Sequence, residues 1–190
     1  MKITGRLKVV NSISEALDVF QEFNSREFYT NLVRNQWQNV CNEVESAIGQ
    51  AVFSEIAEGS AEAEGSSYLH FEAEIEEAVV EEVDFIKNGA DLDVNLIEAP
   101  KSNFGGDFYI SVMANIKYTV SAVFSFNVYD SVDKDVISLG GFLEEVELND
   151  EVEVVVCFNY EDDLLVFCNA EVSGLPRSIY FGDVDPNYHE

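Results

Sequence analysis

The chain has 190 residues, and its 37 Asp and Glu outnumber its ten Lys and Arg, which gives a formal charge of −27. This charge argues against direct binding of nucleic acid and favours a basic protein surface as partner, although an acidic surface can also serve solubility alone. The hydrophobic content of 47% predicts a folded chain with a substantial core, as one domain or as a small domain with an appendage.

The lack of a recognisable secretory signal and the spacing of the cysteines predict a cytoplasmic protein. The start, MKITGRLKVV, lacks the apolar core of a secretory signal, and no window has the apolar length that a membrane span needs. We therefore expect no membrane interaction. Cys41, Cys157 and Cys168 lack CxxC spacing, so all three are expected to be reduced. Strand alternation predicts that Cys168 faces the core and that Cys157 lies on the opposite face.

The first third of the chain reads as helical. Residues 3–10 predict a short strand, and residues 11–14 supply capping side chains for a short helix over 15–20. A second helix is expected from Asn24 or Ser25, with apolar residues at three- and four-residue spacing as far as Phe53. Gly49 is a candidate end or kink of that helix. Trp37 lies on the apolar stripe and is interpreted as core packing.

A Gly-, Ser- and Glu-rich stretch at 57–67 predicts a loop and the best internal boundary. We therefore divide the chain into residues 1–60, a short strand plus a helical segment, and residues 61–190, an acidic antiparallel sheet region. The two parts can still form one continuous domain. Alternation predicts strands at 69–76 and 92–96. Residues 78–88 fit either a strand or a helix, and Val83 and Phe85 favour a strand.

The longest periodic stretch is residues 107–129, where apolar residues occupy every second position from Phe108 to Val128. At roughly 3.3 Å per residue, one straight strand of this length would extend about 75 Å. That length exceeds a domain of this size. We therefore expect the run to bend or to be shared between two regions of sheet.

The remaining pattern predicts a meander. A turn is expected at 130–135, followed by strands at about 136–148, 151–160 and 164–172, with Gly140-Gly141 as a bulge. Three-residue turns are predicted at 149–151 and 161–163, which would set Val156 opposite Cys168. The tail from 174 to 190 is expected to be a loosely packed loop. The predicted fold class is α+β, an N-terminal helical segment followed by an antiparallel β meander.

Catalytic and metal-binding patterns are missing from the sequence. The two histidines, His70 and His189, have no suitably placed partners for a catalytic triad or a zinc site, and His70 is expected on the solvent face of its strand. The acids of 130–135 and of 91–95 lack the glycine and distant Glu of a calcium loop. We predict no catalytic residue, no metal site and no cofactor, and hence no enzyme.

The acidic residues are the informative feature. Residues 1–60 hold eight acids and five bases, whereas residues 61–190 hold 29 acids and five bases, so the negative field belongs to the sheet region. Two acid-rich blocks there are predicted to bind the partner, and no oligomeric state is predicted. Their residues are Glu72, Glu74, Glu76 and Glu77 in the first block, and Glu144, Glu145, Glu147, Asp150, Glu151, Glu153, Glu161, Asp162 and Asp163 in the second.

Part of this pattern resembles PIN-type nucleases. The stretch RLKVVNSISEALDVF and the helix after it resemble the closing strand and helix of that family. The run ISVMANIKYTVSAVFSF, its acidic turn and the Val/Glu-rich strands are similar to the β-rich C-terminal region of some bacterial PIN proteins. The nuclease body and its metal-binding acids would lie upstream of Met1. The resemblance therefore implies an accessory or regulatory β domain and carries over no nuclease activity.

Small size, extreme acidity and the lack of an active-site motif resemble the phage-encoded DNA-mimic inhibitors of the anti-restriction and anti-CRISPR classes. That resemblance implies binding to the basic DNA- or RNA-binding channel of a bacterial defence complex. It gives our first functional hypothesis, a non-enzymatic inhibitor. The accessory β domain is the alternative.

Overall fold

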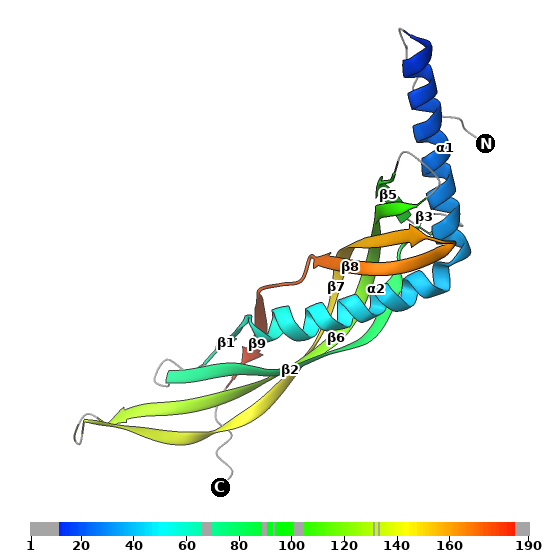
Figure 1. Ribbon diagram of the computed structural model, residues 1–190. Coiled ribbons are helices and arrows are strands. Elements are labelled where there is room, and N and C mark those ends of the chain that lie inside the picture. The colour runs from blue at the N-terminus through cyan, green and yellow to red at the C-terminus, as the bar shows by residue number, and fades with distance from the viewer. Residues whose placement is uncertain are drawn as a thin grey trace.

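The structure is a computed structural model. It describes residues 12–65, 70–88, 91–92, 94–100, 105–130, 132 and 134–184. The strand predicted at 3–10, His189, Asp93 and Asp133 lie outside the described residues. Two helices precede a mostly antiparallel sheet, which confirms the α+β class. The body is elongated, and the first half of α1 projects from one end of it (Figure 1).

The helical part consists of α1 (Ile13–Asn35), α2 (Trp37–Ala51) and the π-helix η1 (Val52–Ile56). Ser12 caps α1, since its hydroxyl accepts a hydrogen bond from the Glu15 amide at 3.1 Å, so the predicted capping is confirmed. Gln36 separates the two helices. Its backbone amide donates to the carbonyls of Leu32 and Val33 at the end of α1.

The predicted division of the helices is wrong in two places. No new helix starts at Asn24 or Ser25, because α1 runs without interruption from Ile13 to Asn35. The buried Ser25 hydroxyl donates to the Pro100 carbonyl and does not cap a helix. Gly49 neither ends nor kinks the helix, since α2 continues through it to Ala51. Trp37 packs against the core, with its ring 5.5 Å from that of Phe85 in an edge-on contact, as predicted.

The main sheet has the strand order β2-β6-β7-β8, with β5 also paired to β6. The bounds are β2 (His70–Phe85), β5 (Val94–Glu98), β6 (Gly106–Asp130), β7 (Asp135–Glu161) and β8 (Leu164–Ser173). A short pair joins β3 (Lys87–Asn88) and β4 (Asp91–Leu92), and β1 (Ser60–Glu64) runs parallel to β9 (Ser178–Asp183).

Strand β6 is the centre of the sheet. It is 25 residues long and pairs with β7 from Gly106 to Asp130. Its other side is shared, since β5 pairs with residues 109–112 and β2 with residues 114–127. The expectation of a run shared between two sheet regions is therefore confirmed. Figure 1 also shows that the strand curves along the body.

The irregularities of the sheet lie on the strands that flank β6. The residues without a Cα partner at register shifts are Glu76 and Glu81 in β2, Ile97 in β5, Leu139 in β7 and Cys168 in β8. Each is one extra residue, which is the definition of a bulge. The predicted bulge at Gly140-Gly141 is confirmed next to Leu139, where Gly140 has a φ of 93°, a value that favours glycine.

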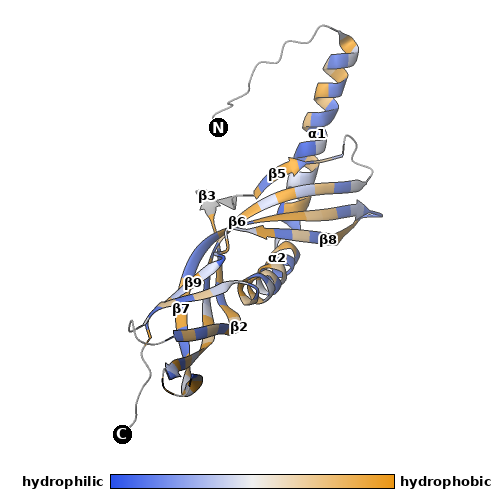
Figure 2. Cartoon of the chain, turned by 90° about the vertical axis from the view of Figure 1, so that its left-hand side faces the viewer, coloured by the Kyte–Doolittle hydropathy of each residue, from blue (hydrophilic) through white to orange (hydrophobic). Residues whose placement is uncertain are grey.

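The core lies on one face of this sheet. Alternate β6 residues from Phe108 to Phe126 are buried, and they pack with helical residues in one cluster. The ring of Tyr29 in α1 lies 4.8 Å from that of Phe108, and the ring of Phe181 in β9 lies 5.4 Å from that of Phe124. Figure 2 shows the resulting alternation of hydropathy along the strands. Burying each such aromatic ring contributes about 1.5–3 kcal/mol.

The predicted turn at residues 149–151 is wrong. Strand β7 continues through these residues, and Asn149, Asp150 and Glu151 pair with Lys117, Ile116 and Asn115 of β6. Val146, Leu148, Val152 and Val154 all occupy even positions, so an unbroken strand keeps them on one face without a turn. The Asp150 side chain accepts a hydrogen bond at 2.6 Å from the buried hydroxyl of Tyr118, which gives the acid a partner inside the sheet.

The predicted register of β8 is also wrong. The turn before β8 has two residues, Asp162 and Asp163, with φ of 50° and 62°, as in a two-residue hairpin turn. Val156 pairs with Ala170, and Cys168 is the bulge residue. As a result Cys168 is exposed and does not face the core, so its predicted face is wrong. Cys157 lies on the face opposite the core, as predicted, although it is buried there. All three cysteines are free, as expected.

The loop predictions for 57–67 and 174–190 need correction. Each stretch holds a strand, β1 and β9 respectively, and the two strands pair in parallel from Ser60 and Ser178 onward. Ile179, Phe181 and Val184 are buried, so the described part of the tail is packed and not loose. None of the described helices combines the length and the apolar character that crossing a membrane requires.

Candidate binding surface

The face of the sheet opposite the core carries rows of acidic residues on β2 and β7. The ring contacts from the helices and β9 all fall on the core-facing residues, such as Phe85, Phe108 and Phe124. The alternate residues of the strands lie on the other side, which we call the open face. Its centre is β6, whose open-face residues are mostly uncharged polar ones, Ser111, Asn115, Thr119, Ser121 and Ser125, with Met113, Lys117 and Val123 between them.

Two rows of glutamates flank this polar strip. The β2 row is Glu72, Glu74 and Glu77, and the β7 row is Glu145, Glu147, Glu151 and Glu153; all seven are exposed. Glu77 and Glu145 both pair with Ser121, so they stand directly across β6 from one another. Two strand spacings separate the rows by about 10 Å. Acids two residues apart within a row are about 7 Å apart, whereas Glu147 and Glu151 are about 13 Å apart because Asn149 lies between them.

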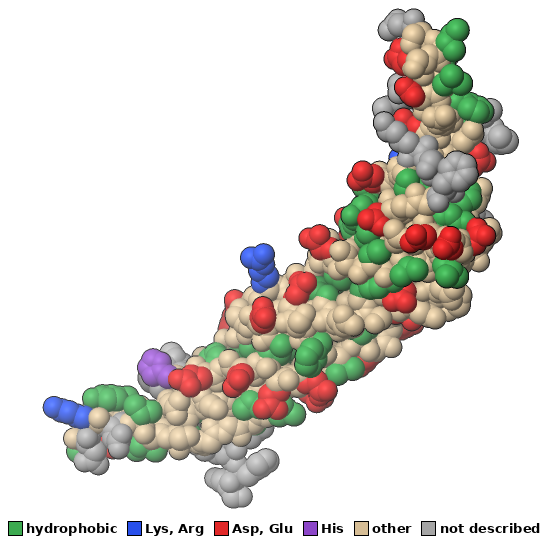
Figure 3. Space-filling model, viewed as in Figure 1, with side chains coloured by type: hydrophobic (Ala, Val, Ile, Leu, Met, Phe, Trp, Pro, Cys, Tyr) green, Lys and Arg blue, Asp and Glu red, His purple; other side chains and the backbone are tan. Residues whose placement is uncertain are grey.

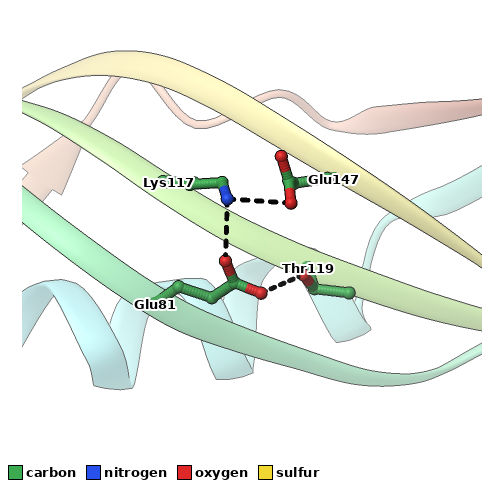
Figure 4. A network of polar contacts seen from close by, with 4 residues as sticks. All are labelled: Glu81, Lys117, Thr119 and Glu147. Carbon is green, nitrogen blue, oxygen red and sulfur yellow. Dashed lines mark hydrogen bonds and ion pairs between the residues drawn. The ribbon is translucent and has the colours of Figure 1, made fainter.

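Lys117 joins the two sides of the open face (Figure 4). Its Nζ lies 3.2 Å from a Glu81 carboxylate oxygen and 2.8 Å from one of Glu147. Thr119 donates a hydrogen bond to Glu81 at 2.6 Å. The Thr119 and Lys117 contacts lower the pKa of Glu81, and the contacts with Glu147 and Glu81 raise the pKa of Lys117. Both shifts favour the charged forms.

Further polar contacts hold the β7 row in place. The buried Ser111 hydroxyl donates to the Glu153 carboxylate, and the amide of Asn159 donates to Asp107 at 2.6 Å. These contacts link β6 to β7 on the open face. They orient Glu153 without neutralising it, because a hydroxyl carries no charge.

The structure separates the thirteen predicted partner-binding residues into four groups. Seven form the two rows. Glu144 and Asp150 fall on the core-facing side of β7, where Glu144 is exposed and Asp150 binds Tyr118. Glu76 is the bulge residue of β2. Glu161, Asp162 and Asp163 occupy the β7–β8 turn, where Asp163 accepts a hydrogen bond from Tyr160 at 2.8 Å that raises the pKa of the phenol.

The sequence interpretation missed Lys117 and Glu81 as parts of this surface. A signal for Lys117 was present, because it is the one base in the 25 residues of β6. Glu81 belongs to the doublet Glu81-Glu82, which interrupts the alternation of β2 at a bulge. The extra residue of a bulge changes the direction in which a side chain points, and here the Glu81 carboxylate reaches Lys117.

The described residues contain no cluster of three or more His, Cys, Asp or Glu arranged to hold a metal ion. Asp133 and Asp93, which complete the two acidic stretches weighed as calcium sites, lie outside the described residues. A hollow of about 500 Å³ lies between α2 and β8. The residues that line it are Glu43, Ser46, Ala47, Gln50, Ala51, Ser54, Glu55, Phe167, Asn169, Ala170, Glu171 and Val172. This set contains no His, Cys, Lys or Arg.

Comparison with known proteins gives no relative for this surface: no family model, curated protein or solved structure matches the chain. The functional argument therefore rests on the geometry and charge of the open face.

Proposed function

We propose that this chain is a non-enzymatic acidic binding protein that inhibits a bacterial defence complex of the CRISPR or restriction type. Its open face would occupy the basic surface that otherwise holds DNA or RNA, and it would act in the cytoplasm. The observation that carries the proposal is the pair of glutamate rows on either side of β6, whose open-face residues between the rows are uncharged apart from Lys117. The acids that Figure 3 shows along the visible side of the body add to the same field.

The dimensions of the rows suit a basic nucleic-acid channel. Their separation of about 10 Å lies between the widths of the minor and major grooves of B-DNA, about 6 and 12 Å. Each row carries on average one acid per roughly 8–9 Å, against one charge per about 3.4 Å along a DNA strand. The rows therefore offer about two-fifths of the linear charge of a phosphate backbone.

Repulsion between the acids of the open face also favours a basic partner surface. Acids two residues apart within a row lie about 7 Å from one another, which is closer than the Debye length of about 8 Å at physiological salt, so they repel one another. Among the described residues, the open-face ion pairs are those of Lys117. A basic partner surface would relieve the remaining repulsion, and this gain adds to the direct attraction.

Displacement of a labelled duplex from purified defence complexes tests the proposal. A panel of Cas9-type, multi-subunit CRISPR and restriction complexes is incubated with fluorescent target DNA and increasing amounts of the chain. We expect displacement from at least one complex, weakening as NaCl is raised from 50 to roughly 300 mM. Retention of DNA by every complex at low salt would contradict the inhibitor function.

A second candidate function rests on α1. Ile13, Leu17, Phe20 and Phe23 are 56–82% exposed on the projecting half of this helix, where Figure 3 shows hydrophobic side chains. Such a stripe suits a helix that packs against a further protein body, as the accessory domain of a PIN-type nuclease would. Binding to a purified PIN nuclease body, abolished by L17K/F20K, would favour this function over inhibition.

A further inference from the structure

The outer edge of β7 is unusually open over one regular segment. Residues Phe142–Asp150, here called the free edge, pair with β6 on one side. On the other side β8 begins to pair only at Glu153, and no described strand pairs with the free edge. In an antiparallel ladder about every second residue turns its amide and carbonyl outward. The free edge therefore presents a row of backbone donors and acceptors.

Other sheet edges are protected by bulges. Strand β2 has extra residues at Glu76 and Glu81, and β8 has one at Cys168. Bulges twist an edge and break its regular hydrogen-bonding row, which blocks the addition of another strand. The free edge contains none, because the β7 bulge lies at Leu139, before its start.

The side chains of the free edge define what could pair with it. On the open face it presents Glu145 and Glu147, both exposed. On the core-facing side Val146 and Leu148 are only partly buried while packing against the core, so apolar surface remains for a neighbour to cover. A strand laid along this edge would place alternate residues next to the glutamates and the others next to Val146 and Leu148.

A second copy of the chain is a poor occupant. Two free edges paired with one another would bring Glu144, Glu145, Glu147 and Asp150 against the same acids, and like charges directly opposite destabilise a sheet. Glu144 adds a further negative charge to this edge, on the core-facing side of β7, which a second acidic edge would repel. Charge complementarity therefore selects a basic segment.

We propose that the free edge of β7 binds an extended partner segment in which Lys or Arg alternates with branched apolar residues, adding it as a further strand of the sheet. Main-chain hydrogen bonds would supply affinity, and the alternating side chains would supply specificity. The inference deepens the proposed function, since the segment would belong to the basic surface that the chain occupies.

A capped nine-residue peptide of alternating Lys and Val tests this mode of binding. Its comparison peptide has the same composition with the lysines grouped together. We expect the alternating peptide to bind at least tenfold more tightly in fluorescence anisotropy. It should slow amide hydrogen exchange in 142–150 by at least tenfold and leave exchange in β2 unchanged. Every second amide nitrogen of the peptide can be methylated in two ways, on the odd-numbered or on the even-numbered residues. Only one of these two peptides should lose binding, because the amides that donate to β7 all lie on one edge of the peptide.

Variants of the chain distinguish binding at the free edge from the proposed inhibition of a defence complex. E145Q/E147Q should weaken the alternating peptide several-fold, whereas the matched pair E72Q/E74Q, on the bulged β2, should not. Equal binding of both peptides, or unchanged exchange in 142–150, would overturn the edge inference even if the chain displaces DNA from a defence complex. Protection of the free edge without displacement of DNA from any complex would uphold the edge inference and reject the inhibitor function.

Discussion

The ammonium of Lys117 lies 2.8 Å from the carboxylate of Glu147, so the one base of β6 is engaged at the centre of the β7 row. The same ammonium reaches Glu81 of β2 at 3.2 Å. Lys117 thereby compensates charge on both sides of the open face. Removing it would leave the acids of β2 and β7 facing each other across the polar strip.

We predict that K117M lowers the melting temperature at low salt and that the difference from the parent shrinks as NaCl is added, because salt screens the exposed repulsion. The measurement is thermal unfolding by circular dichroism at several salt concentrations. R177M, which removes an exposed base outside the main sheet, is the control and should have a smaller effect. A K117M deficit that does not change with salt would show that packing of the lysine stem matters more than its charge.

Charge removal should slow association with a basic partner more than it speeds dissociation. We expect E145Q/E147Q/E151Q, and separately E72Q/E74Q/E77Q, to fold normally and to lower the association rate on the order of tenfold. D18N/E22Q/E27Q removes three acids from α1 and should leave the rate nearly unchanged. Stopped-flow association with a defence complex that the parent inhibits measures all three. Equal losses in the three variants would mean that total charge, and not the open face, steers the encounter.

The cysteines should differ in reactivity in the folded protein. Cys168 is exposed, whereas Cys41 and Cys157 are buried, and burial raises the pKa of both buried thiols, that of Cys41 to about 11. We expect one thiol to react rapidly with a colorimetric disulfide reagent and all three to react after denaturation without reductant. C168S should abolish the rapid phase. Two rapid thiols in the folded parent would contradict the burial of Cys157.

Tyr118 should make stability fall at high pH. Burial and the hydrogen bond to Asp150 raise the pKa of its phenol above the ordinary value of about 10. The folded state therefore holds this proton more tightly than the unfolded state. Its contribution is complete below pH 10 and is lost as pH rises further.

Denaturant unfolding between pH 9 and 11.5 measures this effect. We expect Y118F to reduce the downward slope of the unfolding free energy by up to about 1.4 kcal/mol per pH unit. Y129F, at an exposed position near the end of β6, is the control and should keep the parent's slope. Parallel curves for Y118F and the parent would show that the Tyr118 proton does not contribute.

Hydrophobic alternation was sufficient to predict the strands around β6 but not their register, and it did not predict β1 and β9. The central run and its sharing between two sheet regions were predictable, because even-numbered apolar residues run without interruption from Phe108 to Val128. Bulges were harder to recognise, although the doublets Glu76-Glu77 and Glu81-Glu82 mark both positions in β2. A single extra residue at Cys168 likewise made the predicted face of that cysteine wrong.

A turn was wrongly predicted from composition at 149–151, where the backbone pairs with β6. Asn149-Asp150-Glu151 has the composition of a turn, yet β6 pairs with all three residues and Tyr118 hydrogen-bonds Asp150. The candidate surface was predictable as two acidic blocks, since charge is read directly from the sequence. The division of those blocks between the open face, the core-facing side and the β7–β8 turn was not predictable, because it depends on the exact register.

The parallel pairing of β1 with β9 makes the order of synthesis matter. Strand β1 leaves the ribosome long before β9, its only described strand partner, has been translated. Phe181 of β9 also covers Phe124 in the middle of β6. A nascent chain released before residue 184 would therefore expose that aromatic cluster, and shortened translation products should be rapidly degraded or held by chaperones while the complete chain escapes both.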